Sequence, residues 1–208
     1  MMTGHIYETD LSGDNQKKLS NTTILNIFDA SWGKGAKNAI IKFLSAGSQE
    51  INLYSAEFNG SSTIGVFLPN NVKSAVASKT ENKIAYLVSE QDKEFIFTAD
   101  IKNGKKKQIL SLPASDFTVS FKNPDTLSIL TKPSAFLKGY LYLAGANLEN
   151  GSSKNLNKVT EGNGLNALWS YDGEKIFIFE ISDKQIQNRV ENLKDKQIFE
   201  LPIKTFPE

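Results

Sequence analysis

The chain has 208 residues, with 24 Lys and Arg against 23 Asp and Glu, one histidine and no cysteine. A net charge of +1 creates no field that would attract nucleic acid or an anionic membrane, so we expect neither as a partner. Without cysteine there are no disulfides, thiolate nucleophiles or sulfur-ligated zinc sites, and one histidine cannot build a multi-histidine site, so we expect no metal and no cofactor.

The sequence contains no recognisable membrane or export segment. No window reaches the roughly 18 apolar residues that a membrane-spanning helix requires. The first five residues lack the charged leader and the apolar core of a signal peptide. We therefore expect no membrane insertion within this segment.

In chain order, residues 5–11 and 16–19 predict a short hairpin around a polar turn. Four longer units follow, each made of short apolar or alternating segments that favour β-strands. The predicted strands cover residues 28–32, 39–44, 51–58 and 64–68, then 72–77, 84–88, 94–101 and 107–110, then 117–121, 126–130, 140–144 and 156–159, and finally 165–169, 175–181 and 197–201.

The units repeat in register. Each first strand ends at a corresponding residue, namely Trp32, Ala77, Ser120 and Trp169, and these are 45, 43 and 49 positions apart. Periods in the forties with four short strands per unit are typical of propeller blades. The predicted fold is therefore an all-β propeller of four-stranded antiparallel blades. Within the single domain 1–208 we expect a half-blade at 4–22 and blades at about 24–69, 70–113, 114–161 and 162–203.

Two apolar columns mark the interior of the predicted blades. Positions seven and nine beyond each register residue are apolar in every unit: Ala39, Ile84, Leu127 and Ile176, then Ile41, Tyr86, Ile129 and Ile178. Their period of two puts them on one face of the second strand, where blades pack together. Trp32 and Trp169 are then expected to be core anchors, with ligand stacking as the alternative.

Residues 182–196 have two interpretations. Ile186, Val190 and Leu193 have helical spacing, and Ser182 with Gln185 resembles a capping box. By repeat position the same segment is the third strand of the fourth blade. We favour the strand, because otherwise the sheet of the fourth blade would lack a strand between its second and last strands.

Residues 169–176, WSYDGEKI, suggest a family. They resemble the Ser-Pro-Asp-Gly-x-x-Ile motif of TolB-type and WD-repeat-like propellers, with Tyr171 in place of the usual proline. Residues 4–8, 19–24 and 131–135 are similar to stretches of uncharacterised bacterial propeller proteins. The resemblance covers essentially the whole chain and implies the fold rather than an activity. It also implies an exported or membrane-anchored extracytoplasmic location, since relatives often carry an amino-terminal anchor.

Signatures of specific chemistry are missing. The glycines and lysines at 33–37 lack phosphate-loop spacing and a following helix, so they predict an inter-strand turn. No Gly-x-Ser-x-Gly elbow is present. Paired carboxylates for glycan hydrolysis stay open, because such pairing is spatial. Glu180 is the one acid in an apolar setting, where the simplest interpretation is a strand end that reaches solvent.

We therefore expect a non-catalytic propeller scaffold that binds a protein, peptide or glycan through loops between blades. The loops offer Asn21, Asp116, Lys132 and Asn163 as polar contacts. One alternative is a hydrolase of glycan or peptide with acids at the channel mouth. Another is the accessory propeller of a larger protease. Because the opening hairpin matches only the outer half of a blade, we also expect a fragment whose missing blades belong to the same natural chain.

Overall fold

The structure is a computed structural model that describes residues 4–47, 50–59, 62–113, 116–134, 136–147, 156–182, 185–192, 194–195 and 197–200. Within these ranges the chain forms seventeen β-strands, one short 3-10 turn (η1, Lys34–Ala36) and no α-helix. No helix there is long and apolar enough to cross a lipid bilayer. The all-β prediction is confirmed.

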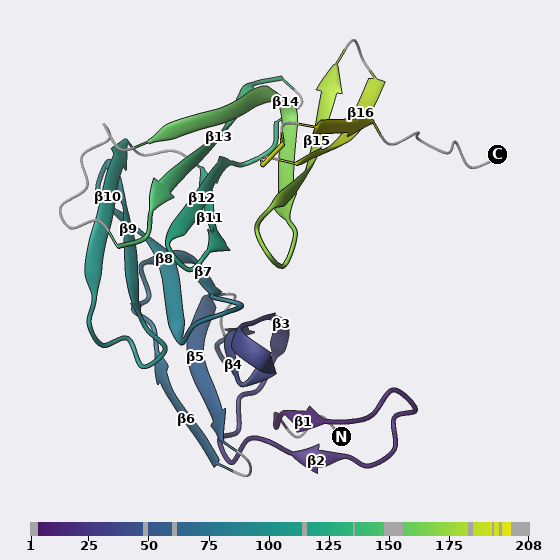
Figure 1. Cartoon of the computed structure of the whole chain (residues 1–208). Helices are drawn as coiled ribbons and strands as arrows, with labels where there is room; N and C mark the ends of the chain where they lie inside the picture. The colour runs from purple at the N-terminus through teal and green to yellow at the C-terminus, as the bar shows by residue number, and fades with distance from the viewer. Residues whose placement is uncertain are drawn as a thin grey trace.

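The strands form antiparallel sheets that follow the order of the chain (Figure 1). A small hairpin of β1 (Tyr7–Glu8) and β2 (Lys17–Lys18) comes first. The first blade contains β3 (Ile27–Trp32), β4 (Asn38–Leu44), β5 (Ile51–Asn59) and β6 (Ser62–Phe67). The second contains β7 (Val72–Ala77), β8 (Lys83–Glu90), β9 (Lys93–Asp100) and β10 (Lys107–Pro113).

The remaining seven strands form one continuous sheet in which the third blade runs into the fourth. They are β11 (Phe117–Asn123), β12 (Thr126–Thr131), β13 (Lys138–Gly145), β14 (Asn157–Trp169), β15 (Lys175–Ser182), β16 (Gln185–Asn192) and β17 (Gln197–Glu200). Of the segment with two interpretations, residues 185–192 therefore form a strand, while residues 183, 184, 193 and 196 lie outside the described residues. β16 pairs with β15 over eight consecutive residues, which a helix could not do.

One predicted loop is wrong. We expected Asn163 to lie in a loop between blades, but it lies inside β14, which pairs first with β13 and then with β15. The pairing with β15 shifts register between Asn163 and Asn166, and Gly164 has φ +58°. A bulge at a glycine bends a strand without ending it, so the two blades share one long strand instead of a loop.

The two apolar columns are buried as predicted. All eight side chains are at most 1% exposed. Each pair faces the preceding unit: Ile84 and Tyr86 pack with Ile40 of the first blade, and Ile176 and Ile178 pack with Leu130 and Leu141 of the third. The columns thus form the inter-blade core.

The two tryptophans differ, although they occupy the same repeat position. Trp169 is half-buried in the cluster between the third and fourth blades, with the Lys122 ammonium 5.6 Å from its ring centre. Trp32 is 40% exposed and leans on Phe58. The expectation of two core anchors is wrong for Trp32, because the small hairpin in front of the first blade does not cover its inner strand.

The blades form an arc that is not closed within the described residues (Figure 1). At one end the hairpin packs Ile6 and Leu19 against the first blade. At the other end, the row Leu168, Phe177, Val190 and Phe199 crosses the outward face of the fourth blade. Leu168 and Phe199 are 65% and 52% exposed, so this end lacks the cover that the other blades have.

Candidate functional site

Two of the predicted site residues meet at one end of the third blade. Phe117 of β11 is paired with Thr131 of β12, so the residues just beyond them, Asp116 and Lys132, are adjacent. Their main chains are joined by a 2.7 Å hydrogen bond from the Lys132 N–H to the Asp116 carbonyl. Their side chains form a 3.0 Å ion pair that is largely exposed to solvent.

The pair lies at the rim of a hollow of about 460 Å³. This volume is in the range of small-ligand pockets, roughly 300–1,000 Å³. Its lining combines charged, hydroxyl and aromatic side chains: Asp116, Phe117, Thr131, Lys132, Pro133, Ser134, Leu137, Lys138, Tyr140 and Tyr142.

The aromatic wall comes from β13. Tyr140 and Tyr142 alternate with buried residues, so both rings project from the same face of the strand. Their centroids are 6.0 Å apart with planes inclined at 24°, which is a stacked arrangement. The Thr131 hydroxyl accepts a 2.8 Å hydrogen bond from the Tyr140 N–H, which fixes the start of β13 against β12.

The loop between β12 and β13 is held at its base and exposed at its tip. The Ser134 hydroxyl accepts hydrogen bonds from the N–H groups of Phe136 and Leu137, and its carbonyl accepts one from Gly164. Phe136 is nevertheless 94% exposed and Leu137 71% exposed. Leu137 lines the hollow and Phe136 precedes it in the chain, and exposed apolar side chains of this size favour contact with a ligand over solvent.

Charges of alternating sign surround the hollow. The Lys132 hydrogen bond and charge, assisted by Lys73, hold the pKa of Asp116 below its ordinary value. Lys73 in turn forms a 2.9 Å ion pair with Glu94, which is fully buried. The second carboxylate oxygen of Glu94 has no hydrogen-bond partner among the described residues.

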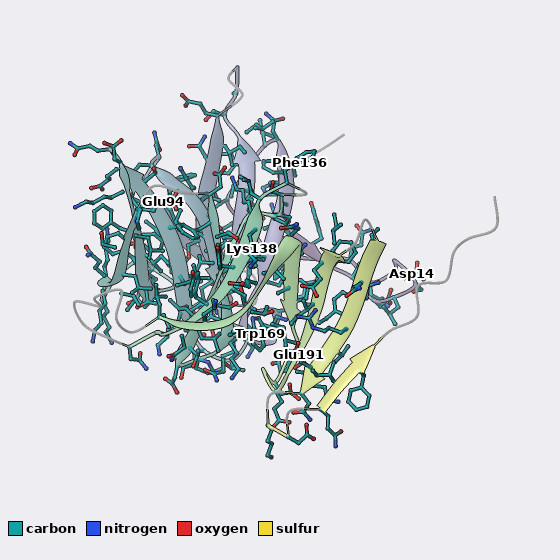
Figure 2. The ribbon with its side chains drawn as sticks, turned by 90° about the horizontal axis from the view of Figure 1, so that it is seen from above. Asp14, Glu94, Phe136, Lys138, Trp169 and Glu191 are labelled. Carbon is teal, nitrogen blue, oxygen red and sulfur yellow. The ribbon has the colours of Figure 1, made fainter. Side chains whose placement is uncertain are left out.

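A second charged cluster borders Tyr140. Glu161 of β14 accepts hydrogen bonds from Lys138 and Lys158, in that order of influence, and they lower its pKa to about 2. The same contacts raise the pKa of both lysines. Figure 2 shows Lys138 on the third blade, apart from Glu94 in the second and Glu191 in the fourth. These groups are charged at neutral pH and are suited to binding rather than to proton transfer.

The other two predicted residues are not part of this hollow. Asn163 lies in β14, paired with Lys138 on one side and Ile181 on the other, so it is a strand neighbour of the site. Asn21 follows β2 at the far end of the arc (Figure 1). Sequence reasoning missed Phe117, Tyr140 and Tyr142. The sequence feature that could have pointed to the two tyrosines is the alternating run at 139–143, but an ordinary strand has the same alternation.

Glu180 does not lie where the sequence predicts. Glu180, expected at a strand end in solvent, is instead 15% exposed and ion-paired with Arg189, which also binds Glu191. Arg189 thus holds both carboxylates in ion pairs. No group of three or more His, Asp or Glu that could hold a metal occurs among the described residues.

No protein-family model matches the chain, and no curated protein is significantly similar in sequence. Among solved structures, TolB from Acinetobacter baumannii is similar with a TM-score of 0.63 and 13% identity, covering 95% of this chain and 48% of that one. An oligogalacturonate lyase in complex with manganese has a TM-score of 0.64 and 12% identity, covering 94% and 58%. The β-propeller domain of the Trilobed protease from Pyrococcus furiosus, described as having an open velcro topology, has a TM-score of 0.50 and 14% identity, covering 86% and 57%.

The chain thus spans about half the length of these proteins. At identities of 12–14% the likeness is one of fold and carries no activity with it. It agrees with the sheet order, the buried columns and the open arc described above. The chain therefore has a TolB-like β-propeller fold whose ring is not closed by the described residues.

Proposed function

We propose that the chain is a non-catalytic binding module that takes a protein, peptide or glycan ligand in the hollow between Asp116 and Tyr142. The observation that carries the proposal is the convergence of a charged pair, two stacked tyrosines and exposed apolar side chains on one concave surface. Aromatic faces supply contact area at low entropic cost, and a few charges set orientation.

The site favours a ligand with an apolar group next to a charged one. An apolar side chain or a sugar face would lie on Tyr140 and Tyr142, and a charged group would pair with Asp116 or Lys132. Because the pKa of Asp116 is lowered, its carboxylate stays ionised from pH 8 down to pH 5. Binding through Asp116 should therefore not change across that interval.

Selection from a random peptide library and screening on a glycan array would test the proposal. Ligands selected on the parent chain should lose about tenfold or more in affinity with Tyr140→Ala or Lys132→Ala, as expected when an aromatic or charged contact is removed. Tyr7→Ala removes an exposed tyrosine from the opening hairpin and is the matched control. Selected ligands that bind both hollow variants as tightly as the parent would refute the proposal. Enzymatic turnover of a selected ligand would also refute it.

A second candidate function is the accessory propeller of a larger protease. It is favoured by the similarity to a propeller that is one domain of the Trilobed protease. Under this proposal the partners include further blades of the same natural chain, and the hollow would receive a polypeptide. An extracytoplasmic location is part of both proposals and is supported by the TolB-like fold alone.

A further inference from the structure

A second hollow, of about 440 Å³, lies at the opposite ends of the strands from the Asp116 site. It is bordered by η1 in the first blade, by the β7–β8 and β9–β10 turns in the second, and by Asn147, which follows β13 in the third. Four of its lining residues are lysines, namely Lys34, Lys83, Lys105 and Lys107. Among the described residues, the carboxylates that line it with them are Glu81 and Asp100.

The two carboxylates are already engaged. Glu81 forms a 2.8 Å ion pair with Lys83. Asp100 accepts hydrogen bonds from the N–H groups of Lys102 and Gly104, so its carboxylate serves the β9–β10 turn. Lys34 and Lys105, by contrast, have no ion pair in the part of the chain that the structure describes. Lys34 and Lys105 line the same concavity, so an anion bound there would pair with two cationic side chains.

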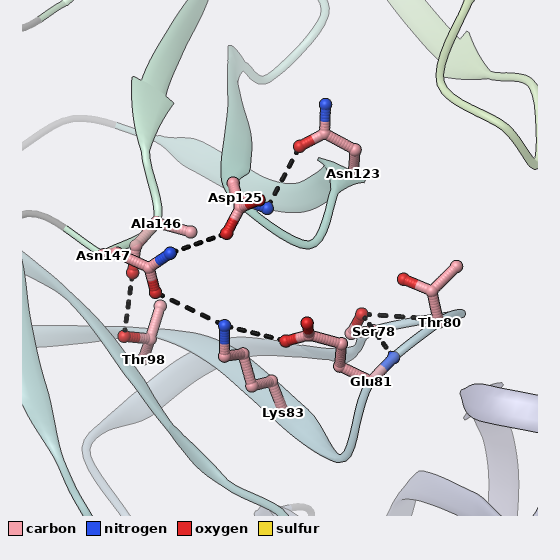
Figure 3. Close-up of polar contacts among 9 residues, drawn as sticks. All are labelled: Ser78, Thr80, Glu81, Lys83, Thr98, Asn123, Asp125, Ala146 and Asn147. Carbon is pink, nitrogen blue, oxygen red and sulfur yellow. Dashed lines mark hydrogen bonds and ion pairs between the residues drawn. The ribbon is translucent and has the colours of Figure 1, made fainter.

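The wall of this hollow is preorganised (Figure 3). Asn147 donates a 2.6 Å hydrogen bond to Asp125 and accepts one from Lys83. The buried Thr98 hydroxyl donates to the carbonyl of Ala146, which joins the second blade to the third. Lys83 is therefore held in place from two sides, and less ordering is required when a ligand binds.

We propose that this hollow binds a small phosphate-bearing anion with at least two phosphate groups. Lysines are point charges suited to phosphate oxygens, and two lysines without an ion pair, Lys34 and Lys105, match a ligand with two phosphate groups better than one carboxylate. The volume exceeds that of a single phosphate, which favours a diphosphate or a nucleoside diphosphate. This site is separate from the Asp116 hollow and does not depend on its function.

Calorimetric titration with inorganic pyrophosphate at low ionic strength tests the proposal. The parent chain should bind one pyrophosphate, and Lys34→Ser/Lys105→Ser should weaken binding by about tenfold or more, since two unpaired cations are lost. Raising the salt concentration should weaken binding of the parent, as screening predicts. Lys17→Ser/Lys93→Ser removes the same charge from exposed positions elsewhere and should change affinity by less than about twofold.

Titration with ADP separates the two sources of the phosphate groups. Affinity equal to that of pyrophosphate indicates recognition of the diphosphate alone, and tighter binding indicates a nucleotide; either supports the proposal. Failure of both anions to bind would overturn it. Equal weakening in the site variant and the control variant would also overturn it, because the effect would then be one of net charge.

Discussion

Gly173 of the fourth blade lies against the main chain of the third blade. It has φ +72°, and a Cβ built on it would overlap the main-chain carbonyl of Lys122. Gly173→Ala therefore combines the cost of a left-handed residue with overpacking against a backbone that cannot rotate away. We expect a loss of about 2–4 kcal/mol in the free energy of unfolding, measured by urea denaturation followed by circular dichroism.

The matched control for this substitution is Gly47→Ala. Gly47 also has a positive φ, +79°, but a Cβ built there meets nothing within 4 Å among the described residues. Only the conformational cost of about 1 kcal/mol should appear. Equal losses in the two variants would mean that the contact between the turns contributes nothing to stability.

At the same scale, the candidate site was only half predictable. Asp116 and Lys132 could be chosen because both flank predicted strands, and the hairpin register then brings them together. Tyr140 and Tyr142 could not, because a period of two is the same for a strand that faces a neighbouring blade and for one that lines a hollow. Asn21 was placed by its position in a loop, and sequence order does not tell which loops meet in space.

Among the elements, repeat position predicted β16 better than its own residues did. The helical spacing in residues 182–196 is local, whereas the pairing with β15 is set by the exposed edge of the sheet. The reverse error occurred in β14. Asn163-Gly164 is a turn signal, but the same pair also suits a bulge, and only the neighbouring strands decide between them. The residue types therefore indicated an unusual backbone conformation but did not show whether it was a turn or a bulge.

Arg189 holds β16 against the third blade. It binds Glu180 and Glu191, whose side chains are 15% and 19% exposed, and donates a 3.3 Å hydrogen bond to the Thr160 hydroxyl of β14. Arg189→Met would leave two mostly buried carboxylates facing each other. We expect a loss of about 3 kcal/mol at pH 7, because breaking a buried pair costs more than the pair contributes. Urea denaturation at pH 7 measures it.

A triple variant identifies the cause. Adding Glu180→Gln and Glu191→Gln to Arg189→Met removes both negative charges and should restore most of the stability at pH 7. A loss that is not rescued would instead indicate that the arginine acts through the packing of its aliphatic stem.

For the molecule as a whole, the main feature is that its two ends differ. In the first three blades the second-strand positions facing the next blade are covered, as in Ile40, Ala85 and Leu87, each of which is 0% exposed. The corresponding positions in the fourth blade are Phe177 and Phe179, and both are only partly buried. An apolar sheet face left open in this way favours association with another sheet.

We therefore expect the 208-residue chain to self-associate through the fourth blade. Phe199→Lys places a charge in the row Leu168, Phe177, Val190 and Phe199, at a site already 52% exposed, so the fold should survive while association weakens. Light scattering after gel filtration over a range of concentrations measures the mass of both chains. Phe136→Lys makes the same change at a side chain that is 94% exposed on the third blade and should associate like the parent. A parent chain that stays monomeric at every concentration and binds no hydrophobic dye would show that this face is not adhesive. If Phe136→Lys weakens association and Phe199→Lys does not, the contact between chains is made instead by the loop beside the Asp116 hollow.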